Sequence, residues 1–162
     1  MIRAYLDSSA FVKEFGEEIG SQVAHKLFVA SEKGKIELVT SQWTIGESIA
    51  AIDRKFRRNE ITEQQRDEII STLLGRTANL ANKNNLIIVV LDENLVTNSW
   101  KYVTSDHISA DDALQLLSCI VTRSQAFVAS DKYLLQAIKQ EGIDCYNIED
   151  EKDADKIIKL LE

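Results

Sequence analysis

The stretch "YLDSSAFVKEF" (residues 5–15) places an acidic residue directly after an apolar run. Residues 2–6 are predicted to form a short strand, and Ser8 or Ser9 is predicted to cap the helix that follows. Asp7 therefore lies where a strand ends and a helix begins. In a parallel α/β sheet this is the edge at which ligands bind. A capping or turn aspartate would explain the same short pattern, so the rest of the chain has to decide.

Composition sets the class of protein. The 162 residues, of which 44% are hydrophobic, indicate a single domain spanning 1–162. No apolar run approaches the roughly 18 residues that span a membrane, and no secretory signal is visible. Cys119 and Cys145 lack CxxC spacing and are expected to be reduced thiols in a cytoplasmic protein. A net charge of −7 argues against nucleic-acid binding by charge alone, but it is compatible with a metal-dependent enzyme, whose ligand carboxylates add negative charge.

Strand and helix patterns alternate along the whole chain. The predicted strands are 2–6, 36–40, 86–91, 126–130 and 144–148. The predicted helices are 9–33 with a break near Gly16, 42–58, 62–83, 92–104, 109–124, 131–141 and one at the end of the chain. This alternation predicts a mostly parallel sheet with helices on both faces. The run "LIIVVL" at 86–91 is predicted to be a strand buried on both faces, and the absence of Gly-rich phosphate loops argues against those nucleotide sites.

Acidic residues follow two of these strands. Asp7 ends the first strand and Asp131 ends the strand at 126–130, so parallel strands would bring both carboxylates to one edge of the sheet. Glu47 lies in the helix after the second strand. On pattern alone an exposed surface glutamate is the favoured interpretation of Glu47, although the side of the helix that it shares with Trp43 is not wholly polar and is a candidate cleft wall.

Two adjacent acids open the helix at 109–124, and helical phase separates them. The apolar face predicted for this helix consists of Ala110, Ala113, Leu114, Leu117, Ile120 and Val121. Asp111 points with Gln115 on a polar stripe and is expected to be a solvated acid of the first turn. Asp112 points with Leu116 and is expected to be partly buried. A partly buried carboxylate needs a partner, and a metal ion is one candidate.

Several carboxylates in one cleft repel one another unless a cation lies among them. Mg²⁺ and Mn²⁺ prefer oxygen ligands and usually retain bound water. Such an ion can activate water for attack on a phosphodiester. The acidic pattern therefore suggests metal-dependent hydrolysis.

Four motifs give the chain a family resemblance. "YLDSSAFVKEF" with Asp7, "TIGESIAAI" with Glu47, "ISADDALQLLSCI" with Asp112 and "AFVASDKYLLQAIKQEGI" with Asp131 occur in this order. The chain resembles PIN-domain proteins, specifically the VapC-like toxin ribonucleases, over nearly its whole length. Alignment of the Asp-Ala-Leu element selects Asp112 rather than Asp111 as the third acid.

The resemblance implies a fold, an activity and partners. It implies a PIN-like three-layer α/β sandwich and a Mg²⁺- or Mn²⁺-dependent endoribonuclease, the toxin of a type II toxin–antitoxin pair. The four matching acids would be both the catalytic residues and the metal ligands. A homodimer and a small inhibitory antitoxin protein are also implied. Tyr133 stands where some relatives carry a further acid, which weakens the case for a second metal ion.

Alternatives remain at this level. The chain could be a catalytically silent PIN-fold module that acts through protein or RNA contacts. A phosphatase ranks third, because "LDSS" lacks the second aspartate of a DxD nucleophile pair. Ser8 and Ser130 either bond to the site carboxylates or a metal-bound water, or they cap helices. The basic residues of "DRKFRRNE" (53–60) either contact RNA phosphates or belong to a solvated helix end, which we favour.

Overall fold

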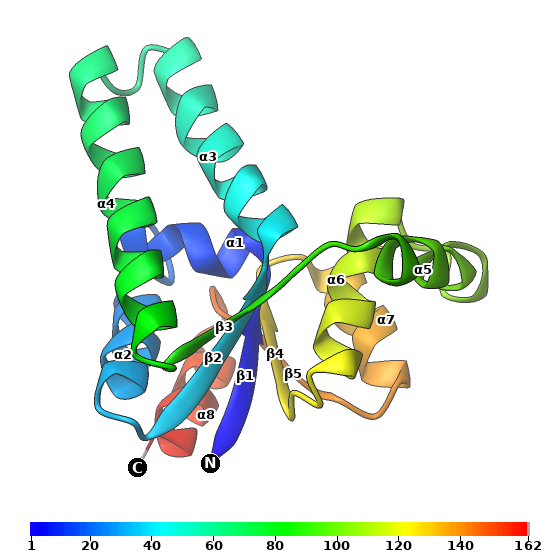
Figure 1. Cartoon of the computed structure of the whole chain (residues 1–162). Coiled ribbons are helices and arrows are strands. Elements are labelled where there is room, and N and C mark those ends of the chain that lie inside the picture. The colour runs from blue at the N-terminus through cyan, green and yellow to red at the C-terminus, as the bar shows by residue number, and fades with distance from the viewer. Residues whose placement is uncertain (162) are drawn as a thin grey trace.

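A five-stranded sheet with helices on both faces forms the protein, as seen in a computed structural model that describes residues 1–161. The strand order is β3-β2-β1-β4-β5, and every neighbouring pair is parallel (Figure 1). The elements are β1 (Ile2–Leu6), α1 (Ser8–Phe11), the 3₁₀ helix η1 (Val12–Phe15), α2 (Ser21–Glu32), β2 (Ile36–Ser41), α3 (Gln42–Arg57), α4 (Glu63–Asn82), β3 (Leu86–Val89), α5 (Glu93–Ser105), α6 (Ala110–Val121), β4 (Ala126–Ala129), α7 (Lys132–Gln140), β5 (Asp144–Asn147) and α8 (Glu151–Leu160).

Two hydrophobic cores lie on opposite faces of this sheet. In β1, Ala4 and Leu6 pack with helices α1 to α4 and α8, whereas Tyr5 between them packs with α5, α6 and α7. This division follows from the strand period of two residues, because successive side chains point to opposite faces. The result is the three-layer sandwich predicted from the sequence, with the sheet in the middle (Figure 1).

The central strand β1 marks a change of direction in the sheet. The chain adds β2 and β3 on one side of β1, and later adds β4 and β5 on the other side. In open parallel sheets, ligands bind outside the carboxyl ends of the strands at such a switch point. Asp7 follows β1 directly, and Asp131 comes two residues after the end of β4. The fold therefore brings two of the predicted acids to the place where α/β proteins bind ligands.

Helices α3 and α4 form a hairpin that extends beyond the sheet (Figure 1). The turn at its tip has the predicted capping box: the Thr62 hydroxyl accepts a hydrogen bond from the Gln65 amide at 3.2 Å, and the Gln65 side chain accepts one from the Thr62 amide at 2.8 Å. Local capping thus fixes where α4 begins. Figure 1 also shows that α5, α6 and α7 lie together on the opposite side of the sheet.

Two sequence predictions are corrected by the packing. The "LIIVVL" run does not form a strand buried on both faces, because β3 is an edge strand whose Ile87 and Ile88 are half-buried and Val90 beyond it is 63% exposed. The predicted apolar face of α6 is also partly wrong. Ala110 and Val121 are exposed, whereas residues 113–119 are all buried, since α6 is enclosed by the sheet and its neighbouring helices.

Two further expectations concern membranes and thiols. In residues 1–161, no helix has the length and apolar character needed to cross a bilayer. Cys119 is buried, Cys145 is half-buried, and neither forms a disulfide. Burial raises the pKa of the Cys119 thiol to about 12, which keeps it protonated and unreactive at neutral pH.

Candidate functional site

Asp7 connects β1 to α1 and is buried at the carboxyl edge of the sheet, with 5% of its surface exposed. Its Oδ1 atom accepts hydrogen bonds from the Ala10 amide at 3.0 Å and from the Ser9 hydroxyl at 2.7 Å. Asp7 itself is therefore the helix cap, in place of the predicted Ser8 or Ser9. Within residues 1–161 both bonds fall on Oδ1, so Oδ2 remains available for a ligand.

The charge of Asp7 is poorly compensated by the protein. Burial raises the pKa of the Asp7 carboxyl to about 7, and the negative charges of Glu47 and Asp112 add to this rise. The bonds from Ser9 and Ala10 oppose the shift without cancelling it. A carboxyl that is half-protonated near neutrality, with two acids nearby, is an environment that a cation would stabilise.

Glu47 lies on α3, one turn after its start, and is half-buried. This position excludes the exposed surface glutamate that the sequence pattern favoured. Its Oε2 atom accepts a hydrogen bond from the Gln115 side-chain amide at 3.0 Å. Burial raises the pKa of Glu47 and the charge of Asp111 raises it further, while the side chains of Ser8 and Gln115 act in the opposite direction.

Ser109 caps α6 and places both Asp111 and Asp112 in its first turn. Asp112 is half-buried, as predicted, and its pKa is raised first by burial and then by the charges of Asp111 and Asp131. Asp111 is also half-buried instead of solvated. The predicted polar stripe behind it faces inward, because Gln115 is buried against Tyr5 and Thr44.

Asp131 is the exposed member of the group and caps α7. Its Oδ1 atom accepts hydrogen bonds from the Tyr133 and Leu134 amides at 2.8 and 3.1 Å. The preceding residue ties this loop to the first motif, since the Ser130 amide donates to the Ser9 hydroxyl oxygen at 2.8 Å. Ser9 therefore joins the two strand ends that carry Asp7 and Asp131.

The fold brings the predicted acids close enough for their charges to interact, but it does not arrange them tightly around one position. The charges of Glu47 and Asp112 raise the pKa of Asp7, and the charge of Asp131 raises the pKa of Asp112. Among residues 1–161, however, no three acidic, histidine or cysteine side chains form a group compact enough to hold a metal ion. The all-oxygen donor set and the free Oδ2 of Asp7 fit Mg²⁺ or Mn²⁺ in kind, because these ions retain water and need one or two direct carboxylates.

Sequence reasoning missed the polar residues that hold this site together. Ser9, rather than Ser8 or Ser130, bonds to Asp7, although the Ser8 side chain lies close enough to lower the pKa of Glu47. The sequence pattern puts Gln115 on a polar stripe, whereas in the structure it is buried and contacts Glu47 from inside the protein. One available signal was that Gln115 interrupts the run Ala-Leu-Gln-Leu-Leu in the most apolar helix pattern of the chain.

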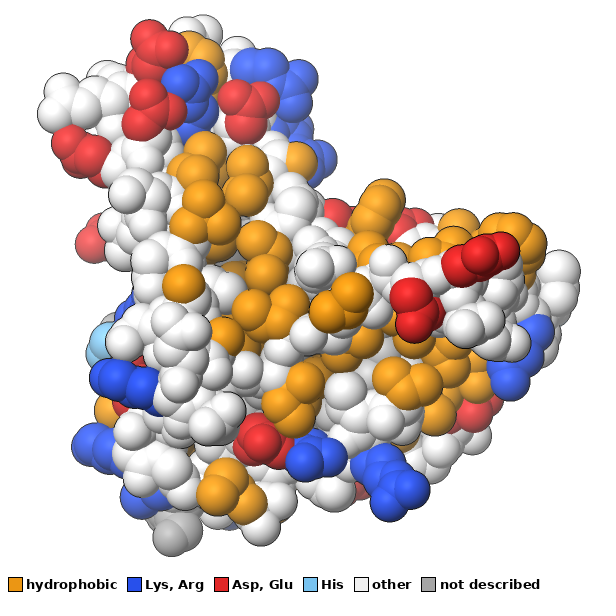
Figure 2. All heavy atoms as spheres, viewed as in Figure 1, with side chains coloured by type: hydrophobic (Ala, Val, Ile, Leu, Met, Phe, Trp, Pro, Cys, Tyr) orange, Lys and Arg blue, Asp and Glu red, His pale blue; other side chains and the backbone are white. Residues whose placement is uncertain are grey.

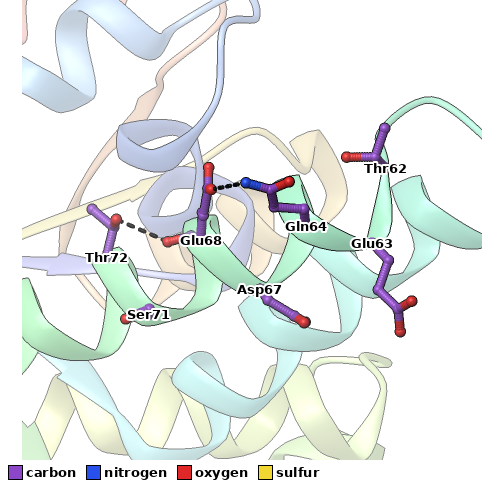
Figure 3. Close-up of a pocket in the computed structure, with 7 residues that line it drawn as sticks. All are labelled: Thr62, Glu63, Gln64, Asp67, Glu68, Ser71 and Thr72. Atoms are coloured by element: carbon purple, nitrogen blue, oxygen red, sulfur yellow. Dashed lines mark hydrogen bonds between the residues drawn. The ribbon is translucent and has the colours of Figure 1, made fainter.

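A broad depression on the outer side of α4 is a less suitable site. Figure 3 shows its lining residues along consecutive turns of one helix, where Gln64 donates to the Glu68 carboxylate at 2.8 Å and Thr72 donates to the Glu68 carbonyl at 2.9 Å. Every lining residue is exposed. The depression therefore offers a solvated helix surface, whereas Asp7, Glu47 and Asp112 at the sheet edge are buried or half-buried.

Comparisons with known proteins agree with this architecture. The family model described as PIN domain matches residues 4–139. The structure of PAE2754 from Pyrobaculum aerophilum is similar at 16% identity and a TM-score of 0.65, over 98% of this chain and 95% of that one.

Two further solved structures share the fold. VapC20 from Mycobacterium tuberculosis, a Sarcin-Ricin loop cleaving toxin, is similar at 16% identity and a TM-score of 0.58, over 83% of this chain and 94% of that one. FitAcB from Neisseria gonorrhoeae is similar at 12% identity and a TM-score of 0.63, over 90% and 97%. No curated protein gives a significant sequence match.

Proposed function

The chain belongs to the PIN domain family, and from this premise we propose that it is a metal-dependent endoribonuclease, the toxin of a type II toxin–antitoxin pair. The observation that carries the proposal is the group of acids at the carboxyl edge of the sheet. Asp7, Glu47 and Asp112 each have a raised pKa, and each is buried or half-buried next to other acids. Burial is the main cause of these raised pKa values and repulsion between the acids adds to it, and a divalent cation would compensate both effects.

The four acids of the motifs would hold the ion, with Asp7 through its free Oδ2 atom and with Glu47, Asp112 and Asp131 around it. A bound Mg²⁺ or Mn²⁺ would supply a water of lowered pKa and would stabilise negative charge on the phosphoryl oxygens. The protein supplies the positioning. Asp7 is fixed by its two capping bonds, and Glu47 is fixed by Gln115.

The choice of Asp112 over Asp111 has an electrostatic basis. The charge of Asp112 raises the pKa of Asp7, and the charge of Asp131 raises the pKa of Asp112, so Asp112 is electrostatically coupled to the acids that follow β1 and β4. Asp111 instead affects Glu47 and Asp112. We therefore assign the metal to Asp112 and give Asp111 a supporting role in the negative potential of the site.

RNA is the proposed substrate, and one cation is well placed for it. VapC20, which shares the fold, is described as cleaving the Sarcin-Ricin loop. On α3, Arg54 is exposed and lies about two helical turns beyond Glu47 on the same face. Arg57 and Lys55 are engaged with Asp53 and Glu18 at 2.9 and 3.3 Å, as expected of a solvated helix end. Arg58 is also exposed but lies at the end of α3, farther from Glu47, so Arg54 is the member of the basic cluster best placed to contact a phosphate.

The proposal includes protein partners. A second copy of the chain and a small antitoxin are the expected partners, as the resemblance to VapC-like toxins implies, and the similarity to FitAcB and VapC20 supports a toxin of this class. A catalytically silent binding module is the alternative. The presence of all four acids in their motif positions favours the enzyme.

Cleavage of a structured RNA by the purified protein tests this function. We expect cleavage with Mn²⁺ or Mg²⁺ and none in EDTA. Asp7→Asn or Asp112→Asn should reduce the rate at least about 100-fold, because a few kcal/mol of transition-state stabilisation is lost. Asp111→Asn is the matched control on the same helix turn and should lose less than about tenfold.

Three results would oppose this assignment. Undiminished cleavage in EDTA would exclude the metal mechanism. Equal losses for Asp111→Asn and Asp112→Asn would remove the distinction between the two acids. A protein that binds Mn²⁺ and RNA but never cleaves would favour the binding module.

A further inference from the structure

The amide of Gln115 lies beneath the candidate site and links two helices. Its Nε2 atom donates to Glu47 Oε2 at 3.0 Å, so a residue of α6 holds a carboxylate of α3. Gln115 is 3% exposed, in the middle of a buried segment that is otherwise almost entirely apolar. A buried amide is costly unless its hydrogen bonds are satisfied, and leucine would serve packing better at this position.

Two hydroxyl groups fix the direction in which this amide points. The Gln115 Oε1 atom accepts from the Tyr5 hydroxyl at 2.5 Å and from the Thr44 hydroxyl at 2.8 Å. Both partners are fully buried. An amide has one acceptor end and one donor end, so two donors at Oε1 turn the NH₂ group toward Glu47. The reversed amide would point its oxygen at the carboxylate and would be repelled.

The sheet anchors this network. Tyr5 belongs to the central strand β1, and its ring stacks on Phe127 of β4 with centroids 5.2 Å apart and planes at 12°. The strongly raised pKa of Tyr5, caused by burial, keeps its hydroxyl protonated as a donor. A chain of contacts therefore runs from the core of the sheet through Gln115 to the Glu47 carboxylate.

We propose that Gln115 is a positioning residue that orients the Glu47 carboxylate for binding of the divalent cation, and that Tyr5 and Thr44 act through it. The inference rests on the proposed function, because it assigns Glu47 to the metal. Outer hydrogen-bond partners of metal ligands typically contribute 10- to 100-fold to affinity or activity. Two buried hydroxyl groups from β1 and α3 orient the Gln115 amide, and the amide donates to the Glu47 carboxylate, which is the pattern expected of such a support.

Mn²⁺ titration calorimetry on the full chain tests the inference. Gln115→Met keeps the volume of the side chain but removes both hydrogen-bonding ends, and it should weaken Mn²⁺ binding at least about tenfold. Tyr5→Phe and Thr44→Val should each weaken it less, although neither residue bonds to Glu47. Tyr5→Phe should cause no further loss when combined with Gln115→Met, because its effect passes through the amide.

Ser48→Ala provides the control. Ser48 is buried on the same helix as Glu47, and its hydroxyl donates to the Thr44 carbonyl at 2.8 Å. Its loss should lower the melting temperature and leave Mn²⁺ affinity unchanged, which shows that destabilising α3 is not enough. If Gln115→Met does not fold, Tyr5→Phe and Thr44→Val carry the test.

The possible outcomes distinguish failure of this inference from failure of the proposed ribonuclease function on which it rests. Wild-type Mn²⁺ affinity in folded Gln115→Met, or full additivity of Tyr5→Phe with it, would overturn the positioning role while RNA cleavage by the wild type still stood. A wild-type protein that neither binds Mn²⁺ nor cleaves RNA would overturn both proposals, and the unmodified chain alone would reveal it.

Discussion

Asp7 caps α1, and we propose that the same side chain is also a ligand of the metal ion. Capping α1 requires an acceptor oxygen, which Oδ1 supplies to Ala10 and Ser9. It does not require a charge, since asparagine caps helices about as well as aspartate. Burial instead raises the pKa of Asp7 to about 7, and the buried negative charge lowers the free energy of unfolding in the absence of a cation. A capping aspartate and a metal-binding aspartate therefore produce the same local sequence pattern. Substitution by asparagine distinguishes the two roles, because it keeps the cap and removes the charge.

We predict that Asp7→Asn stabilises the metal-free protein at pH 8. In the unfolded chain the carboxyl titrates near pH 4, whereas the folded pKa is about 7. Between these values the folded state binds more protons, so the free energy of unfolding of the wild type falls as pH rises from about 4 to about 7 and then levels off. Urea unfolding in EDTA across this range should show the asparagine variant matching the wild type near pH 4 and exceeding it at pH 8.

Asp7→Ala is the control for this comparison. It removes charge and cap together and should cost about 1 kcal/mol relative to Asp7→Asn at every pH. Glu47 and Asp112 also titrate at raised pKa values, so the difference between variants, rather than the wild-type curve alone, reports on Asp7. Parallel curves for the wild type and Asp7→Asn would contradict a raised pKa at this residue.

At the scale of helices and strands, the predictions succeeded where local signals suffice. The capping box at Thr62 and Gln65 fixed the start of α4, and the strand-to-helix position of Asp7 and Asp131 brought both to one edge of the sheet. Strand order is not local. The apolar run of β3 therefore gave no sign that it would lie at an edge, with Val90 beyond it 63% exposed.

The site shows the same limit. Helical phase and the family resemblance both select Asp112 as a candidate, and the resemblance alone selects Glu47. Gln115, however, contacts Tyr5 of β1 and Thr44 of α3, which are 110 and 71 positions away in the sequence. The residue periodicity within α6 cannot reveal such partners. A polar stripe on a helix is interpreted as solvent-exposed unless the neighbouring elements that bury it are known.

Two glycines give an element-scale prediction with opposite signs. Gly20 precedes α2 with a φ of +91°, and a Cβ atom there would lie 2.9 Å from the Ile148 carbonyl oxygen. Gly75 lies inside α4, where a Cβ atom meets nothing within 4 Å. Gly20→Ala should destabilise the protein by more than about 1 kcal/mol, and Gly75→Ala should stabilise it by about 0.5–1 kcal/mol.

Thermal or urea unfolding of the two variants measures this contrast. The pair is matched, since each adds one methyl group to a glycine. If both alanine variants were more stable than the wild type, the close contact between Gly20 and the residues after β5 would be absent in solution. The observed start of α2 would then be wrong as well.

At the scale of the whole molecule, apolar side chains remain uncovered. Figure 2 shows hydrophobic side chains gathered on the α3–α4 hairpin and continuing toward α5. Trp43 on α3, Leu74 on α4 and Trp100 on α5 are 43%, 46% and 58% exposed. Contiguous exposed apolar surface of this kind usually marks an interaction site, and it supports the proposed homodimer.

We predict that light scattering at micromolar concentration will give the mass of two chains, and that Trp100→Glu will weaken association at least about 30-fold. Buried tryptophans dominate such interfaces, and a charge at that position would be left unpaired and desolvated. Ile19→Glu is the matched control, because Ile19 is 72% exposed but precedes α2 and belongs to neither the α3–α4 hairpin nor α5. It should leave the dimer intact. A wild-type chain that stays monomeric, or equal weakening by both substitutions, would remove the hairpin–α5 surface as the dimer interface.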